Sequence, residues 1–87
     1  MFIHLGENIV IQMKEIIAIV NKDLVKESAM LSEFVEVNMK KNNIVTISNG
    51  TVKSIVITES KVYFSPLSTV SLKKRSQYAS ELETKNE

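Results

Sequence analysis

The stretch Lys53-Ser-Ile-Val-Ile-Thr-Glu-Ser-Lys-Val-Tyr-Phe-Ser-Pro66 decides the fold of this chain. Two runs rich in β-branched and aromatic residues flank Glu59-Ser60, and Pro66 ends the second run. Such residues favour strands, and two strands this close in the sequence predict a β-hairpin. Glu59-Ser60 is a mediocre two-residue turn, because neither residue takes positive φ as cheaply as Asn or Gly. A longer loop that includes Thr58 or Lys61 therefore fits equally well.

Neither face of this hairpin is wholly polar. Ile55 and Ile57 share one face of the first strand, Val56 takes the other face, and the second strand alternates in a similar way. A sheet with apolar residues on both faces has to be covered on both. We expect a helix on one face and a neighbouring subunit on the other.

Further strand patterns precede the hairpin. An alternating pattern predicts a strand at 2–5, and short runs rich in β-branched residues predict strands at 9–11, 16–20 and 44–47. The run at 16–20 is apolar without interruption, which predicts a central strand buried on both faces. Asn49-Gly50 carries a strong turn signal between the strand at 44–47 and the hairpin.

Residues 24–41 change to a helical period. The positions at helical spacing are Met30, Leu31, Phe34, Val35 and Asn38. Ser28 is the expected N-cap, Asn42-Asn43 suits the exit, and Phe34 is expected to anchor the helix on the sheet. The alternation through 34–37 leaves a strand open as the alternative.

The sequence after Pro66 predicts a last helix. Ser68 is its expected N-cap, and the helix should run from Thr69 to about Leu82. The elements together predict an α+β fold: a small β-rich domain of five to six short, largely antiparallel strands with one middle helix and a C-terminal helix. The chain has 87 residues, which suits one domain. We place this domain at 1–82 and a polar tail at 83–87.

The composition argues against most kinds of catalytic site. The chain has no cysteine and a single histidine, His4, so we expect no disulfide and no metal site. Gly6 and Gly50 are isolated, so no glycine-rich loop cradles a phosphate. We therefore expect neither an enzyme nor a cofactor, and we interpret His4 as a strand residue. The N-terminus has no basic lead, and no run approaches the ~18 apolar residues of a membrane span, which predicts a cytoplasmic protein.

Charge is unevenly distributed, although the net charge is only +1. Residues 1–36 carry three lysines against six acids, a balance of −3. Residues 37–75 carry seven lysines and arginines against Glu59 alone, a balance of +6, and 76–87 return to −2. Such a basic block favours an anionic partner, and the alternative is an ordinary solvated face. A short chain with 44% hydrophobic residues also has apolar surface to spare for a homo-oligomer.

The basic residues supply candidate contacts to double-stranded DNA. Lysine and arginine neutralise phosphates, and hydroxyl groups add neutral phosphate contacts. The candidate DNA-binding residues are Lys14, Thr51, Lys53, Lys73, Lys74 and Arg75. At about 100° per residue, 73–75 spread over more than half the circumference of a helix, so at least two of them should face solvent.

Three segments resemble a known family. Phe2-Ile-His-Leu-Gly6, Lys53-Ser-Ile-Val-Ile-Thr58 and Tyr63-Phe-Ser-Pro through Leu72-Lys-Lys-Arg75 are similar to the small bacterial extracellular matrix regulatory proteins, the RemA/RemB family, and most to its RemB branch. The resemblance covers 1–20 and 44–78 well. It implies a cytoplasmic transcriptional regulator of biofilm matrix genes. For the RemA branch it implies a ring-shaped, DNA-binding oligomer with a subunit similar to LytTR DNA-binding domains.

One segment departs from that branch. The RemA branch carries an arginine pair where this chain has Gly50 and Thr51, and of the basic turn only Lys53 remains. Fewer phosphate contacts weaken DNA binding and lower its dependence on salt. We favour an oligomeric regulator that binds DNA through phosphate contacts, with 73–75 contributing. The alternative is a protein–protein assembly module or partner subunit without DNA binding of its own.

Overall fold

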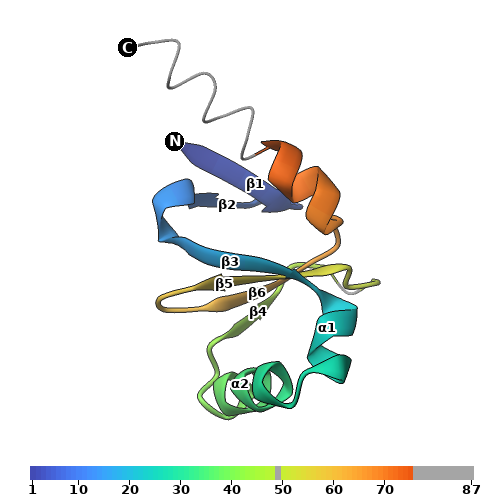
Figure 1. Ribbon diagram of the computed structural model, residues 1–87. Coiled ribbons are helices and arrows are strands. Elements are labelled where there is room, and N and C mark those ends of the chain that lie inside the picture. Colours follow the sequence, from blue (N-terminus) through green and yellow to red (C-terminus); the bar gives the residue numbers. More distant parts are fainter. Residues whose placement is uncertain (49, 76–87) are drawn as a thin grey trace.

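The computed structural model describes residues 1–48 and 50–75, and over these it has the predicted α+β fold. The elements in chain order are β1 (Phe2–Gly6), β2 (Ile9–Gln12), the 3-10 helix η1 (Met13–Glu15), β3 (Ile16–Asn21), α1 (Lys22–Glu27), α2 (Ala29–Lys40), β4 (Ile44–Thr46), β5 (Ser54–Thr58) and β6 (Val62–Ser65). A helical segment at 69–75 follows (Figure 1). The expected end of this helix near Leu82 and the boundary at 82/83 lie outside the described residues.

The β5–β6 hairpin is the centre of a four-stranded sheet of order β3-β5-β6-β4. β3–β5 and β5–β6 are antiparallel, and β4–β6 is parallel. The last paired residues of the hairpin are Ile57 and Val62. The Thr58 hydroxyl donates to the Lys61 carbonyl at 2.7 Å and accepts from the Lys61 N–H at 3.0 Å. The turn therefore takes in Thr58 and Lys61, which is the longer of the two loops that the sequence allowed.

The strand at 16–20 has the predicted place in the chain but not the predicted place in the sheet. β3 lies at one edge and pairs with β5 alone. Ile17 is 63% exposed, at the point where the register of this pairing shifts. The prediction of a central strand buried on both faces is therefore wrong: β3 is an edge strand, and none of its residues is fully buried. A short apolar run does not specify the number of neighbouring strands.

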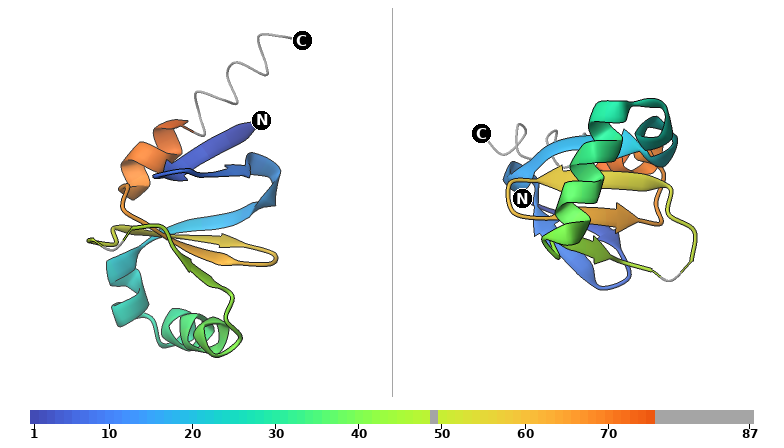
Figure 2. Two further views of the ribbon diagram at one scale, coloured as in Figure 1. Left: turned by 180° about the vertical axis from the view of Figure 1, so that it is seen from behind. Right: turned by 90° about the horizontal axis from the view of Figure 1, so that it is seen from below.

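Both faces of the four-stranded sheet are covered, as the hairpin sequence predicted. Helices α1 and α2 lie on one face, and the β1–β2 hairpin and segment 69–75 lie on the other (Figures 1 and 2). The core on the helix side contains Val35, Ile55 and Val62, and the core on the other side contains Ile3, Leu5, Ile11, Ile47, Val56 and Leu72. The second cover is thus the chain's own N-terminal hairpin and last helix, where a neighbouring subunit was expected.

The middle helix begins and ends as predicted. Ser28 caps α2, with its hydroxyl accepting from the Leu31 N–H at 3.3 Å. After the last turn Asn42 takes φ 58°, the left-handed conformation that asparagine tolerates at helix exits. The strand alternative for 34–37 is excluded. The short helix α1 was not predicted: Asn21 ends β3 and at once caps α1, with its side chain accepting from the Asp23 N–H at 2.9 Å.

Phe34 is not the anchor of α2 on the sheet, so this prediction is wrong. Its side chain is 38% exposed, whereas Val35 is 8% exposed and packs with Ile55 and Val62. The apolar positions of α2 cover a wide arc. The sheet contacts the edge of that arc on which Val35 lies. Phe34 is one residue away, or about 100° around the helix axis, so its ring lies partly in solvent.

Gly6 stands where only glycine fits. Its φ is 129°, and an added Cβ would lie 3.0 Å from the Pro66 Cγ and 3.4 Å from the Ile47 Cγ2. We expect Gly6→Ala to cost about 1–3 kcal/mol of folding free energy, because an L residue at this φ is strained. Urea or thermal unfolding measures the loss. Gly50→Ala is the control and should change stability little, since the nearest atom to its added Cβ, the Ser48 Oγ, is 3.5 Å away.

Candidate nucleic-acid interface

The loop between β4 and β5 is fixed to β6 at both ends. The Ile47 N–H donates to the Phe64 carbonyl at 3.2 Å, and the Lys53 N–H donates to the Ser65 carbonyl at 2.9 Å. The Ile47 side chain is buried, whereas Thr51 and Lys53 are exposed. The loop therefore holds its exposed residues out from one end of the sheet (Figure 1).

Lys53 lies beside Lys22, a residue that the sequence pattern does not single out. The Lys22 N–H donates to the Lys53 carbonyl at 3.2 Å, where Asn21 at the end of β3 pairs with Ser54 at the start of β5. Two lysines thus leave the backbone next to each other. The register between β3 and β5 brings these two lysines together from segments far apart in the sequence, so no local pattern indicates the pair.

Two buried serines attach the basic C-terminal segment to the same end of the sheet. Ser54 and Ser65 are opposite each other in the β5–β6 hairpin, and both are fully buried. The Ser54 hydroxyl donates to the Leu67 carbonyl at 2.7 Å. The Ser65 hydroxyl donates to the Leu5 carbonyl at 2.7 Å and accepts from the Leu67 N–H at 3.1 Å. Since a buried polar group is costly without a partner, these bonds define where the last helix starts.

The helical segment 69–75 presents its basic residues to solvent. Its predicted cap is confirmed, because the Ser68 hydroxyl accepts from the Ser71 N–H at 3.1 Å. Leu72 is fully buried in the core beneath the β1–β2 hairpin. The exposed residues that follow are Lys73, Lys74 and Arg75.

Arg75 differs from its two neighbours. Its Nη1 donates to the His4 carbonyl at 3.0 Å, which ties the helical segment to β1. At about 100° per residue, Lys73 leaves the helix on nearly the opposite side from Arg75, and Lys74 nearly opposite the buried Leu72. Lys73 and Lys74 therefore point away from the protein and are the better placed of the three to meet a phosphate.

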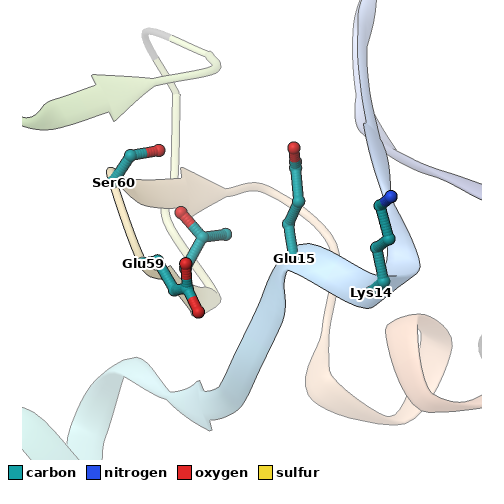
Figure 3. Close-up of a pocket in the computed structure, with 5 residues that line it drawn as sticks. Lys14, Glu15, Glu59 and Ser60 are labelled. Carbon is teal, nitrogen blue, oxygen red and sulfur yellow. The ribbon is translucent and has the colours of Figure 1, made fainter.

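Lys14 lies at the other end of the sheet. It belongs to η1, directly before Ile16, which pairs with Thr58 at the far end of β5 from Ser54. Lys14 lines a hollow together with Glu15, Thr58, Glu59 and Ser60 (Figure 3). The structure thus places Thr51 and Lys53 at one end of the sheet, where the segment that carries 73–75 starts, and Lys14 at the opposite end.

The surroundings of Lys14 have acidic character. Burial raises the pKa of the Tyr63 hydroxyl above its ordinary value, and the Glu15 carboxylate raises it further, because a negative charge disfavours the tyrosinate. A carboxylate in this position also opposes an approaching phosphate, and Glu59 lines the same hollow. Lys14 therefore offers a matched control for the lysines at the opposite end.

Sequence comparisons place these elements in a family. The RemA-like family, described as extracellular matrix regulatory protein A-like, matches residues 2–75. The chain belongs to the RemA-like family. It is also 38% identical over 84 residues to extracellular matrix regulatory protein B of Bacillus subtilis strain 168, an alignment that covers 97% of this chain and 100% of that protein. The resemblance noted from the sequence is confirmed.

The match to the RemA-like family includes every described strand, Lys53 and the basic residues 73–75. Its description is that of a regulatory protein family for the extracellular matrix and not of an enzyme family. Within residues 1–48 and 50–75, no helix is long and apolar enough to cross a membrane. The same residues contain no group of three or more histidine, aspartate or glutamate side chains that could hold a metal ion.

Proposed function

We propose that this chain is an oligomeric transcriptional regulator of biofilm matrix genes that binds double-stranded DNA through phosphate contacts. The observation that carries the proposal is the set of lysines that start from one end of the sheet. The exposed Lys53 stands beside the half-buried Lys22, and the Ser54 hydroxyl holds the start of the segment that carries the exposed Lys73 and Lys74. The RemA-like family supplies the regulatory role.

These cations suit the backbone of DNA better than its bases. Lysine is a flexible point charge that neutralises a phosphate and carries no sequence information by itself. Four lysine contacts from one subunit would lower the observed affinity by about 10²-fold between 50 and 200 mM salt. Such weak contacts give useful affinity when several linked subunits repeat them, because binding of one subunit raises the effective concentration of DNA at the others.

Repetition requires several copies of the chain. We propose a closed homo-oligomer, such as a ring, in which each subunit turns the same end of its sheet toward the DNA. Closure would limit the size of the assembly and leave fewer strand edges, such as that of β3, open to uncontrolled pairing. Light scattering that gave a stable monomer at micromolar concentration would contradict this part of the proposal.

Fluorescence anisotropy with a labelled AT-rich duplex tests DNA binding. We expect the wild-type chain to bind at about 50 mM salt and to lose affinity steeply as salt rises. Lys53→Glu should weaken binding about tenfold or more, because the reversal replaces an attraction with a repulsion in every subunit. Lys14→Glu makes the same charge change at the opposite end and should have a much smaller effect.

A second function follows if wild type shows no binding at about 50 mM salt, where phosphate contacts are strongest. The chain would then be an assembly module or partner subunit that acts through protein contacts. Gly50 and Thr51 favour this candidate, because they provide no positive charge at the tip of the exposed loop. Equal losses for Lys53→Glu and Lys14→Glu would instead show that binding depends on overall charge and not on one end of the sheet.

A further inference from the structure

The two faces of the β1–β2 hairpin differ in what they contact. Ile3 and Ile11 are paired across the two strands, and both are buried in the core beneath the hairpin. Successive residues of a strand point to opposite faces, so Phe2, His4 and Val10 point away from that core. All three are exposed, Phe2 to 62% and Val10 to 53%, and Val10 is the partner of His4 in the pairing. We call these three residues the hairpin face.

Two aromatic rings follow each other on the hairpin face. Phe2 and His4 are two residues apart on β1, so their side chains leave the strand about 7 Å apart on the same side. The His4 Nε2 donates to the Glu7 carbonyl, which holds the imidazole ring in place. Exposed rings on neighbouring outward positions of a sheet are the arrangement on which proteins stack successive unpaired bases.

The helical segment 69–75 brings positive charge to the border of the hairpin face. It lies beside the hairpin on the same side of the four-stranded sheet (Figure 1), and the Arg75 Nη1 donates to the His4 carbonyl at 3.0 Å. A carbonyl is neutral, so this bond leaves the charge of Arg75 available to a phosphate. Lys74 leaves the segment nearly opposite the buried Leu72, so it points away from the protein on the same side as the hairpin face. The one acid among residues 1–12 is Glu7, in the hairpin turn.

We propose that the hairpin face binds single-stranded nucleic acid, with unpaired bases stacked on Phe2 and His4 and with phosphates beside Lys74 and Arg75. Exposed rings alone would suit any apolar partner, and cations alone would suit any anion. A nucleotide carries both a flat base and a phosphate, so it fits the two features together. Val10, opposite His4, adds apolar contact to the same base. Because every base has a π-face, such a site tolerates many sequences.

Binding of a single strand goes beyond the proposed function, which concerns duplex DNA. In a duplex the bases stack on one another, so a protein that binds along the phosphates meets no open base face. The hairpin face therefore has no part in duplex binding, although Lys74 is available to the phosphates of either ligand. A single strand leaves its bases free to stack on protein side chains, which makes the hairpin face selective for unpaired nucleotides.

Tryptophan fluorescence tests the stacking directly, because the chain contains no tryptophan of its own. Phe2→Trp keeps an aromatic ring on the hairpin face, and its emission should be strongly quenched by an oligothymidine of about twelve nucleotides at about 50 mM salt. A duplex of the same length should quench it far less. Phe34→Trp is the matched control and should be quenched by neither, because Phe34 is also partly exposed but lies on α2, on the other face of the sheet.

Fluorescence anisotropy with labelled strands separates the bases from the phosphates. The wild-type chain should bind oligothymidine about tenfold more tightly than an abasic strand of the same length, because only the first offers bases to stack. Phe2→Ala should remove most of this difference, Phe2→Trp should keep it, and Phe34→Ala should leave it unchanged. Oligouridine in a parallel titration distinguishes RNA from DNA as the better ligand, since both present unpaired bases.

The hairpin face is not a stacking site if the wild-type chain binds oligothymidine no better than the abasic strand, or if Phe2→Ala preserves the difference. A smaller mass of Phe2→Ala in light scattering, with unchanged binding of oligothymidine, would assign the face to a contact between copies and overturn the proposal. Duplex binding is titrated separately, and Phe2→Ala should retain it. Binding of oligothymidine without binding of duplex would contradict the proposed function and leave the stacking site standing.

Discussion

Lys73→Glu with Lys74→Glu is expected to abolish DNA binding at about 150 mM salt. Both side chains are exposed, and both leave the helix away from β1. Each lost phosphate contact lowers the slope of log affinity against log salt by about 0.9, and a carboxylate in its place repels the backbone as well. The loss is repeated in every subunit of an oligomer, so two substitutions should have an effect far larger than in a monomer.

The double reversal should leave the fold intact. Leu72 stays buried, the Ser68 cap remains, and Arg75 keeps its bond to the His4 carbonyl. For this reason Arg75 is left unchanged in the test. The melting temperature should therefore move by no more than a few degrees, since surface substitutions away from buried contacts change stability by about 0.5 kcal/mol or less.

Lys14→Glu with Lys61→Glu is the control pair. It makes the same charge change at the end of the sheet where Ile16 pairs with Thr58. This variant should retain most of the binding and part of the salt dependence. If it loses as much affinity as the pair in the C-terminal segment, the DNA does not contact one end of the sheet preferentially.

Local signals in the sequence were sufficient for most of the elements. The runs at 2–5, 44–47 and the hairpin all form strands, because alternation at 2–5 and β-branched residues in the other runs are local features that need no distant partner to be recognised. The caps at Ser28 and Ser68 were also predictable, since a hydroxyl bonds an N–H two or three residues away in the chain. The exception is α1, which was missed although its cap, Asn21, is an equally local signal.

Packing between elements could not be predicted in the same way. The apolar arc on α2 is wide enough to offer Phe34 or Val35 to the sheet, and only the approach of the sheet decides for Val35. The identity of the second cover was likewise open, because an apolar sheet face does not specify whether the hairpin of its own chain or another subunit fills it. Both outcomes depend on tertiary contacts that no local pattern contains.

The candidate site shows the same division. The exposed basic residues at 73–75 follow from charge and helical spacing alone. The sequence could not show that Lys22 lies beside Lys53 or that Lys14 lies at the opposite end of the sheet, because the end at which a residue lies is set by the register of β3 against β5. That register is fixed over a long sequence separation by the apolar faces of both strands.

Gly50→Arg with Thr51→Arg is expected to strengthen DNA binding by tenfold or more at low salt. The loop has room for both side chains. An added Cβ at Gly50 would lie 3.5 Å from the Ser48 Oγ, an ordinary van der Waals distance. Thr51 is exposed, and the loop is fixed to β6 through Ile47 and Lys53. Two arginines on a held loop lose less freedom on binding than they would on a free chain.

The salt dependence separates phosphate contacts from other gains. Each arginine that neutralises a phosphate should steepen the slope of log affinity against log salt by about 0.9, so the pair should add about 1.8 for each subunit in contact. Anisotropy titrations between about 50 and 200 mM salt measure this slope. Gly50→Gln with Thr51→Gln is the matched control, because glutamine adds length and hydrogen bonding without charge.

The gain should be the same for unrelated duplexes, because phosphate contacts position a protein without reading bases. An arginine pair that improved binding to one duplex alone would place the loop in a groove, against base edges, and not along the backbone. If the arginine pair binds no better than the glutamine pair, the loop does not face the DNA. Lys53 would then, like Lys14, make no contact with the DNA, and the contact would come from 73–75 alone.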